Sequence, residues 1–435
     1  MSGVEHRSLR SLLRAVPGAV RRDYAATLVS QWFVLGIGLF LFYVVARRGG
    51  VAGFAFYQIA RGVVSSFQPL AMIGLGQGLH RYLPRAGLGS ERLALQAFLA
   101  QAGVAIGLTL IGTAFGPQVS RLLGLTGGTG AIAAIMIMLI GNCLCSMAVA
   151  ALRGTHQVAR ANTIAAVGFG LIPVIAFPLA DRIDDFLMLQ GAGMTLVAAW
   201  GTLTVRHRSP APPAPHEARP EPSLRILIGY GLRRLPGDMA LPALFTYPTF
   251  AVAVALPGSP EAGYVGFVTS AITLICSVFG TLTPVLLPRL SRAFNTSSAS
   301  VGEGGPTRRM LLRLPLFAAA LAAAAAAVFA FFAPALVSGF LGPEFAAAAG
   351  VLRLGVLAAV PLAMFYAARP TLDALLDRPV ISRLLLGCLL LQVVLTQLAQ
   401  LVLSAPYAAL LALCLAAAVL GSWSERLVVR ALAPA

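Results

Sequence analysis

The sequence predicts an all-α membrane protein of about twelve transmembrane helices, arranged as two pseudo-symmetric six-helix bundles around a central cavity. Between Thr27 and Trp423 the chain consists mostly of apolar runs separated by short arginine-bearing loops. Each run is about 18–25 residues long, which matches the roughly 30 Å hydrocarbon core of a bilayer at a helical rise of about 1.5 Å per residue. Hydrophobic residues make up 58% of the chain and charged residues only 11%, which excludes an ordinary soluble domain.

The predicted spans follow the apolar runs in chain order. Windows such as Leu314–Phe332 lack the polar face that a helix of a soluble domain shows to water. The spans are 27–46, 54–78, 93–115, 131–152, 161–179, 186–205, 236–256, 263–287, 314–332, 345–367, 384–403 and 406–423.

The distribution of the arginines orients these spans. The chain has no lysine, and with the N-terminus inside, 26 of the 32 basic residues fall on the inner side. The positive-inside rule strongly favours this orientation. We therefore expect a multi-pass protein of the bacterial inner (cytoplasmic) membrane with both termini cytoplasmic. The exceptions are four arginines in outer loops and two within spans: Arg47, Arg48, Arg121, Arg182, Arg61 and Arg353.

The domain organisation follows from a Pro-rich segment between the sixth and seventh spans, which favours solvated linker over packed structure. A weak repeat relates the halves: Ala52-Gly53-Phe54 opens the second span and Ala262-Gly263-Tyr264 opens the eighth. Parallel repeats of this kind are the plan of an alternating-access transporter, although chance similarity between Ala/Gly-rich helices is the alternative. The predicted units are a cytoplasmic segment 1–23, bundles 24–205 and 224–423, the linker 206–223 between them and a cytoplasmic tail 424–435.

The second span carries the clearest candidate site. Gln58, Arg61, Ser65 and Gln68 recur at helical spacing and lie along one face within about 80°. Lipid would penalise such a stripe, so we expect it to face protein or a water-filled cavity. Arg61 is deep in its span, where an arginine costs about 2.5–3.5 kcal/mol and usually lines a substrate or ion path.

Arg353 in the tenth span has the same predicted depth as Arg61. We expect both to face one central cavity, each from its own half. The alternative is an arginine that is satisfied by helix-end carbonyls or that snorkels outward. Thr27 and Gln31 in the first span form a softer stripe, which lines the same cavity or serves ordinary close helix packing.

The start of the seventh span carries charge of both signs. Arg234 and Asp238 are four residues apart and can form an ion pair if the helix runs through Pro236. Arg233 and Arg234 could instead contact an anionic lipid head group at the cytoplasmic mouth. Asp238 is the first candidate for coupling to H⁺ or Na⁺.

The remaining composition narrows the function. Acids are scarce within the spans, whereas a cation exporter needs buried carboxylates, so an anionic substrate is expected. No lysine-containing phosphate loop is present, the five cysteines fall in apolar runs, and the histidines lack metal-ligand spacing. We therefore expect no catalytic residues, metal, resident cofactor or enzymatic activity. The net charge of +17 lies in loops between spans, so nucleic acid is not expected as a partner.

Two helical hairpins carry a family resemblance. The first contains Ala46-Arg47-Arg48-Gly49-Gly50-Val51-Ala52-Gly53-Phe54 and ends in Gly74-Leu75-Gly76-Gln77-Gly78-Leu79-His80-Arg81-Tyr82-Leu83-Pro84. It resembles the first hairpin of the Wzx-like polysaccharide (O-antigen) flippases, a branch of the multidrug/oligosaccharidyl-lipid/polysaccharide (MOP) exporter superfamily. A similar hairpin runs from Glu261 to Leu290. The two extra C-terminal spans of MurJ-type lipid II flippases are not found in this sequence.

The resemblance implies translocation of an undecaprenyl-diphosphate-linked oligosaccharide from the cytoplasmic to the outer leaflet for surface polysaccharide biosynthesis. It implies as partners this lipid-linked substrate, membrane lipids, and the polysaccharide polymerase and glycosyltransferases of the same pathway. An arginine-lined cavity agrees with it, because guanidinium groups pair with phosphate oxygens in a bidentate way. The alternative within the superfamily is a multidrug or small-molecule antiporter.

The topology is testable at the linker. A cysteine introduced at Pro213 should react with a membrane-impermeant thiol reagent only after the cytoplasmic side has been opened, because the linker is predicted to be cytoplasmic. Modification of this cysteine from outside intact cells would overturn the predicted orientation.

Overall fold

The computed structural model describes residues 18–83, 90–125, 128–203, 205, 223–280, 306–375 and 380–432. Within these ranges every regular element is a helix, and eleven helices are long and apolar enough to cross a membrane. The helix α2 (Gly18–Met72) is long enough for two crossings, since its dihedral angles break at Gly50, where φ is 59° and ψ is −165°. A left-handed φ of this kind suits glycine, which has no Cβ. The predicted fold class and the twelve crossings are therefore confirmed.

The N-terminal bundle provides six of the crossings. The fifth crossing consists of three segments, α7, η3 and α8, which follow one another without a break. The middle segment, η3, is π-helical. After α2, the bundle consists of α3 (Leu75–Tyr82), α4 (Ser90–Ala114), α5 (Gly116–Leu122), α6 (Gly128–Gly154), α7 (Val158–Ala165), η3 (Ala166–Leu171), α8 (Ile172–Leu179) and α9 (Ile183–Leu203).

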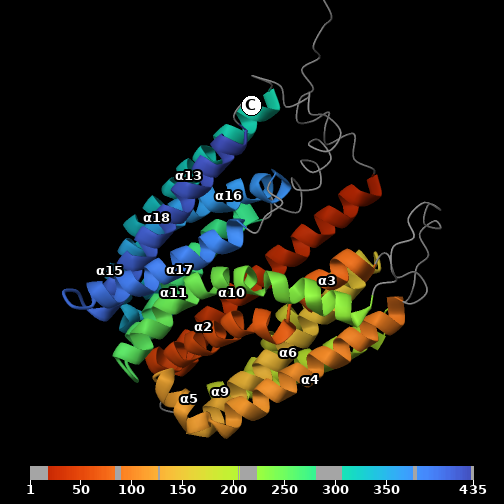
Figure 1. Cartoon of the computed structure of the whole chain (residues 1–435). Coiled ribbons are helices and arrows are strands. Elements are labelled where there is room, and N and C mark those ends of the chain that lie inside the picture. The colour runs from red at the N-terminus through yellow and green to blue at the C-terminus, as the bar shows by residue number, and fades with distance from the viewer. Residues whose placement is uncertain are drawn as a thin grey trace, which may run out of the picture.

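The C-terminal bundle provides the other six crossings, and Figure 1 shows it as the green-to-blue group beside the red-to-yellow N-terminal bundle. Its elements are α10 (Leu224–Ala255), α11 (Glu261–Gly280), α13 (Pro306–Phe331), α14 (Ala333–Leu336), η4 (Val337–Leu341), η5 (Pro343–Phe345), α15 (Ala348–Gly355), η6 (Val356–Ala358), α16 (Ala359–Leu375), α17 (Val380–Ala399) and α18 (Ala405–Ala431).

Several predicted boundaries differ from the structure: α13 begins at Pro306 and α16 ends at Leu375, whereas the sequence placed these boundaries at residues 314 and 367. The seventh crossing begins at Leu224, although the sequence placed its start at residue 236, because α10 continues through Pro236 with its amphipathic N-terminal turns. The last helix continues to Ala431, past the predicted boundary at residue 423. Residues 1–17 and 206–222, which include most of the predicted N-terminal segment and linker, lie outside the described residues.

The two ends of the molecule can be named from its turns. The turns at Gly50, 123–125, 180–182, 256–260 and 400–404 lie at one end, which we call the Gly50 end. The first helix begins and the last helix ends at the opposite end, which we call the linker end because α9 ends and α10 begins there. In Figure 1 the Gly50 end is at the lower left and the linker end at the upper right.

Within the N-terminal bundle, α6 and α9 pack closely through glycine. A Cβ added to Gly141 would lie 2.2 Å from the carbonyl oxygen of Gly191, and one added to Gly191 would lie 2.4 Å from that of Ile137. Small residues of this kind let membrane helices approach until their backbones touch. The α6–α9 pair therefore forms the rigid centre of this bundle.

At the Gly50 end the two bundles meet through aromatic side chains. Phe54 of α2 packs edge-on against Phe345 of η5, with ring centroids 5.4 Å apart, and lies 6.5 Å from the ring of Phe267 in α11. Tyr43 of α2 similarly lies 5.9 Å from Phe340 of η4. Phe54 and Phe345 are fully buried. This aromatic contact closes the space between the bundles at the Gly50 end.

The contact between α2 and α11 continues from this cluster to the middle of the molecule. A Cβ on Gly263 would lie 2.9 Å from the Cα of Ala55, and a Cβ on Gly266 would lie 2.6 Å from the Cβ of Gln58. Further toward the linker end, Ser65 of α2 and Thr273 of α11 are exposed. The two helices are thus in contact in the half of the molecule nearer the Gly50 end, and they are no longer in contact further toward the linker end.

The α10 helix stays close to the N-terminal bundle at the linker end. A Cβ on Gly231 would lie 2.0 Å from the carbonyl oxygen of Ile73, at the end of α2. At the linker end the C-terminal bundle therefore keeps its contact with the N-terminal bundle through α10.

The packing within the N-terminal bundle gives a stability prediction. Gly191→Leu should lower the unfolding temperature of the purified protein, because overpacking of a tight contact costs about 1–3 kcal/mol. Gly107→Leu on α4 is the matched control, since a Cβ there meets nothing within 4 Å. Thermal unfolding in detergent measures both variants, and equal unfolding temperatures would contradict the α6–α9 contact.

Candidate functional site

Arg61 lies where the contact between α2 and α11 ends. One of its terminal nitrogens is 3.4 Å from Oε1 of Gln58 and 3.5 Å from the hydroxyl of Ser270 on α11, so both hydrogen bonds are long. Its guanidinium carbon lies 4.5 Å from the centroid of the Phe42 ring and 5.8 Å from that of Tyr57. These rings hold the guanidinium by cation–π contact without neutralising its charge.

The surroundings of Arg61 supply more hydrogen-bond donors than acceptors. A guanidinium carries five N–H groups, and among the described residues those of Arg61 have only the two long bonds to Gln58 and Ser270. The side-chain nitrogen of Gln58 is also buried without a partner, although the residue is only 4% exposed. Among the described residues no carboxylate pairs with Arg61. An anion with several oxygens would satisfy these donors.

A second polar contact lies nearer the linker end. The side-chain nitrogen of Gln68 on α2 donates to the hydroxyl of Ser146 on α6 at 2.8 Å. Gln68 is seven residues after Arg61, which places it about 10 Å further along the helix axis. This hydrogen bond connects the stripe on α2 to α6, the central helix of the N-terminal bundle.

A pocket of about 340 Å³ adjoins this contact and contains an arginine. Arg153, at the last turn of α6, follows Ser146 by seven residues and therefore lies about 10 Å nearer the linker end. No residue described in the structure forms an ion pair or hydrogen bond with its side chain. The pocket is lined by Ser30, Gln31, Val34, Ser146, Val149, Ala150, Arg153, Ala165 and Phe169.

Sequence reasoning missed Arg153 because it follows the predicted fourth span and was counted with the loop arginines. The helix continues through it to Gly154, and Arg153 is half-buried beside the polar residues of α2. The signal that could have found it is its spacing from Ser146, two turns apart on one face of the helix.

The other predicted residues of the first two spans lie around these two arginines. Gln31 lines the Arg153 pocket, and Ser65 is exposed one turn beyond Arg61. Thr27 accepts a hydrogen bond of 3.1 Å from the side-chain nitrogen of Asn162 on α7. Thr27 therefore packs within the bundle, which corresponds to the alternative of helix packing.

Arg353 does not join this site, which corrects the expectation of a cavity shared with Arg61. Its side chain is exposed, and its Nε donates to the carbonyl oxygen of Ala330, near the end of α13, at 3.3 Å. Its neighbours Leu352 and Gly355 occupy the buried face of α15. Depth along a helix does not determine which face of the helix a residue occupies.

The charged residues at the start of the seventh crossing form the predicted ion pair. Because α10 is helical through Pro236, Nε of Arg234 lies 4.0 Å from a carboxylate oxygen of Asp238. Arg234 also donates to the hydroxyl of Tyr230 at 3.1 Å. A similar pair joins Arg369 and Asp373 on α16 at 3.5 Å. Arg233 is exposed.

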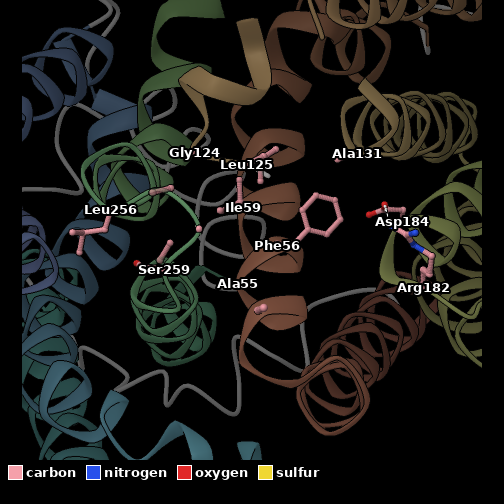
Figure 2. A pocket seen from close by; sticks show the side chains of 14 residues that line it. Ala55, Phe56, Ile59, Gly124, Leu125, Ala131, Arg182, Asp184, Leu256 and Ser259 are labelled. Carbon is pink, nitrogen blue, oxygen red and sulfur yellow. Dashed lines mark hydrogen bonds and ion pairs between the residues drawn. The ribbon is translucent and has the colours of Figure 1, made fainter. Parts of the chain in front are cut away.

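The Gly50 end holds a smaller pocket, shown in Figure 2, with a volume of about 210 Å³. Arg182 and Asp184 line it, and their 3.3 Å ion pair neutralises its charge. A Cβ on Gly124, whose φ is 64°, would lie 1.9 Å from the carbonyl oxygen of Ala253, so the backbones of the two bundles are in contact here. The amide of Gly258 also donates to the carbonyl of Gly124 at 3.3 Å.

Comparison with known proteins finds similarity in the solved structures alone. No family model and no curated protein matches the sequence. The fold matches an inward-facing multidrug resistance MATE family transporter of the MOP superfamily, with a TM-score of 0.69 at 14% identity, over 94% of this chain and 98% of that one. It also matches the lipid II flippase MurJ in an inward closed conformation, with a TM-score of 0.68 at 12% identity, over 93% of this chain and 87% of that one.

A third solved structure shares the fold. An outward-facing MATE family transporter gives a lower TM-score of 0.62, at 13% identity and coverage of 94% of this chain and 96% of that one. The chain therefore has the fold of MOP superfamily transporters. At these identities the likeness concerns the fold alone.

The charge of the site can be measured by the reactivity of a nearby cysteine. Ser65→Cys, in a background whose native cysteines are replaced by alanine, should react faster with an anionic than with a cationic methanethiosulfonate. One unpaired arginine a helical turn away supplies about 1 kcal/mol, or roughly a fivefold rate ratio. Ser404→Cys at the Gly50 end is the control position. Adding Arg61→Gln should remove the preference, and an unchanged preference would show that Arg61 does not set the local potential.

Proposed function

We propose that this protein is a flippase that moves an undecaprenyl-diphosphate-linked oligosaccharide from the cytoplasmic to the outer leaflet by alternating access, for surface polysaccharide biosynthesis. The observation that carries the proposal is the pair Arg61 and Arg153, neither of which has a carboxylate partner among the described residues. A diphosphate provides the charge and the several acceptor oxygens that such guanidiniums lack.

The two arginines are staggered along the path that this substrate would follow. From the levels of Gln68 and Ser146, Arg61 and Arg153 are separated by about 20 Å along the helix axes. The arginine bias assigns the linker end to the cytoplasm. Arg153 therefore receives the diphosphate near the cytoplasmic surface, and Arg61 holds it where the two bundles close.

The free energy of moving the charged head group across the membrane also favours outward transfer. The lipid tail stays in the bilayer while the charged head group passes between the bundles. An inside-negative potential favours outward movement of an anion by about 2.3 kcal/mol per charge per 100 mV. Where the head group leaves water, guanidinium groups replace the water molecules that hydrate it. The free-energy barrier to its passage therefore stays low.

Coupling to an ion is a further part of the proposal. Asp238 and Asp373 lie in the C-terminal bundle and both are paired with arginine. Protonation or Na⁺ binding at Asp238 would release Arg234 toward the cytoplasmic mouth, where Arg233 is also exposed. Transport driven by the membrane potential alone requires no such step.

A multidrug or small-molecule antiporter is the alternative, and the match to MATE family transporters favours it. A cationic drug needs a carboxylate in the substrate cavity. The described part of the N-terminal bundle has its acids near the helix ends, at Asp23, Glu91, Asp181, Asp184 and Asp185, whereas Arg61 lies within α2 and Arg153 lines a pocket. This charge distribution supports the flippase over the antiporter.

The proposed setting is the bacterial inner membrane with both termini in the cytoplasm. The lipid-linked oligosaccharide and membrane lipids are the direct partners. The polymerase and the glycosyltransferases of the same pathway would act on the product and supply the substrate.

Complementation tests the function. In a strain that lacks the native gene, Arg61→Ala should abolish export of the surface polysaccharide while the protein remains inserted, because removal of a membrane arginine eases insertion. Arg61→Lys should restore only part of the export, since ammonium keeps the charge but loses the bidentate fork. Arg153→Ala should reduce export without abolishing it.

Arg353→Ala is the matched control, because it removes an arginine of the same predicted depth that lies outside the site. Its export should equal that of the wild type at equal protein level in the membrane. Normal export by an Arg61→Ala, Arg153→Ala double variant would contradict the anionic-substrate mechanism.

A further inference from the structure

Two of the arginines that depart from the positive-inside distribution are adjacent. Arg47 and Arg48 end the first crossing of α2, at the Gly50 end, and both are exposed. The proposed transport path does not use them. Adjacent residues on a helix point about 100° apart, so the two side chains extend to different neighbours.

Arg47 extends toward the C-terminal bundle. Its guanidinium carbon lies 5.5 Å from the centroid of the Tyr43 ring, one turn earlier on α2. One terminal nitrogen donates to the carbonyl oxygen of Gly339, in η4, at 3.1 Å. Among the described residues, this is the one hydrogen bond that the Arg47 side chain donates. Its remaining N–H groups are therefore open to a ligand.

Arg48 extends in the other direction, toward the N-terminal bundle. Its guanidinium carbon lies 5.5 Å from the centroid of the Phe177 ring in α8, and NH1 donates to the carbonyl oxygen of Phe177 at 3.2 Å. Its contact with Asp181 is 3.9 Å long, and the Asp181 side chain is fully exposed. An exposed ion pair of this length is weak, so it does not neutralise Arg48.

An open groove of about 520 Å³ lies between the two guanidiniums. The groove lies on the surface where the two bundles meet. Helix α8 of the N-terminal bundle borders it on one side, and η4 of the C-terminal bundle lies beyond Arg47. The residues that line it are Tyr43, Val44, Arg47, Arg48 and Phe177.

The groove continues into an apolar surface on the same helix. Phe40, one turn before Val44, is 48% exposed, and Phe33 further along is 47% exposed. In a membrane this surface faces acyl chains, while arginines and a tyrosine at its end lie at head-group level. A ligand that fills both parts has a phosphate head and an apolar tail.

We propose that this groove binds the phosphate of a lipid head group in the leaflet at the Gly50 end. Two guanidiniums held by aromatic rings at a seam provide charge-assisted donors to phosphate oxygens, and the exposed apolar residues of α2 favour a lipid over a soluble anion. The proposal does not depend on the flippase function. Resident anionic phospholipid and a polyprenyl diphosphate share the chemistry that the groove recognises.

Native mass spectrometry of the purified protein tests the site. Titration with phosphatidylglycerol should give a lipid adduct whose affinity falls about tenfold in Arg47→Gln, Arg48→Gln, as expected for the loss of charge-assisted hydrogen bonds. Arg121→Gln, Arg182→Gln is the matched control, because it removes the same charge from the other two arginines of this end. That control should bind as the wild type does.

Further arms distinguish the sources of phosphate. If undecaprenyl diphosphate competes with phosphatidylglycerol, the groove binds both lipids. If it does not compete, the groove binds resident phospholipid. Both results support a lipid-phosphate site. Inorganic pyrophosphate that displaces the lipid at similar concentration would overturn it. Equal losses in the two double variants would also overturn it, since they would reflect net charge alone.

Arg48→Gln alone guards against a folding artefact. Unlike Arg47, Arg48 makes its hydrogen bond within the N-terminal bundle and not across to η4. This single variant should keep the unfolding temperature of the wild type and still bind phosphatidylglycerol several-fold more weakly. Wild-type affinity in this variant would contradict the proposal.

Discussion

The contact between α2 and α11 at Gly263 and Gly266 determines the shape of the molecule. Because neither glycine has a side chain, the two helices approach until Ala55 and Gln58 touch the opposite backbone. The aromatic cluster around Phe54 extends this contact to the Gly50 end. Beyond this contact, toward the linker end, Ser65 of α2 and Thr273 of α11 are exposed, and Arg61 lies where the contact ends.

This geometry explains why an arginine is tolerated so deep in the protein. Phe42 and Tyr57 cover the guanidinium, and Gln58 and Ser270 accept long hydrogen bonds from it. A carboxylate in the same place would neutralise the charge and leave nothing for a substrate to bind. In the proposed function, the unsatisfied donors are the feature that selects an anion whose oxygens can replace water.

The sequence predicted the number of crossings, the fold class and the polar stripe of the second crossing, because these depend on local periodicity and on the cost of burying charge in lipid. It predicted Arg353 in the wrong place, since the face of a helix is set by its neighbours and α15 turns Arg353 toward Ala330. Arg153 was missed because the predicted fourth crossing ends at residue 152, two residues before the end of α6. The contact between Gln68 and Ser146 joins segments distant in sequence, and no local pattern indicates it.

Transport by the purified protein in liposomes measures the central claim most directly. The substrate pair is an undecaprenyl-diphosphate-linked oligosaccharide and the same oligosaccharide joined to the lipid without phosphate, each detected by an enzyme confined to one side of the membrane. If unpaired arginines carry the head group across, only the diphosphate lipid should be translocated. Equal translocation of the two lipids would contradict the claim, because the protein would then recognise the sugar or the tail without using the charge.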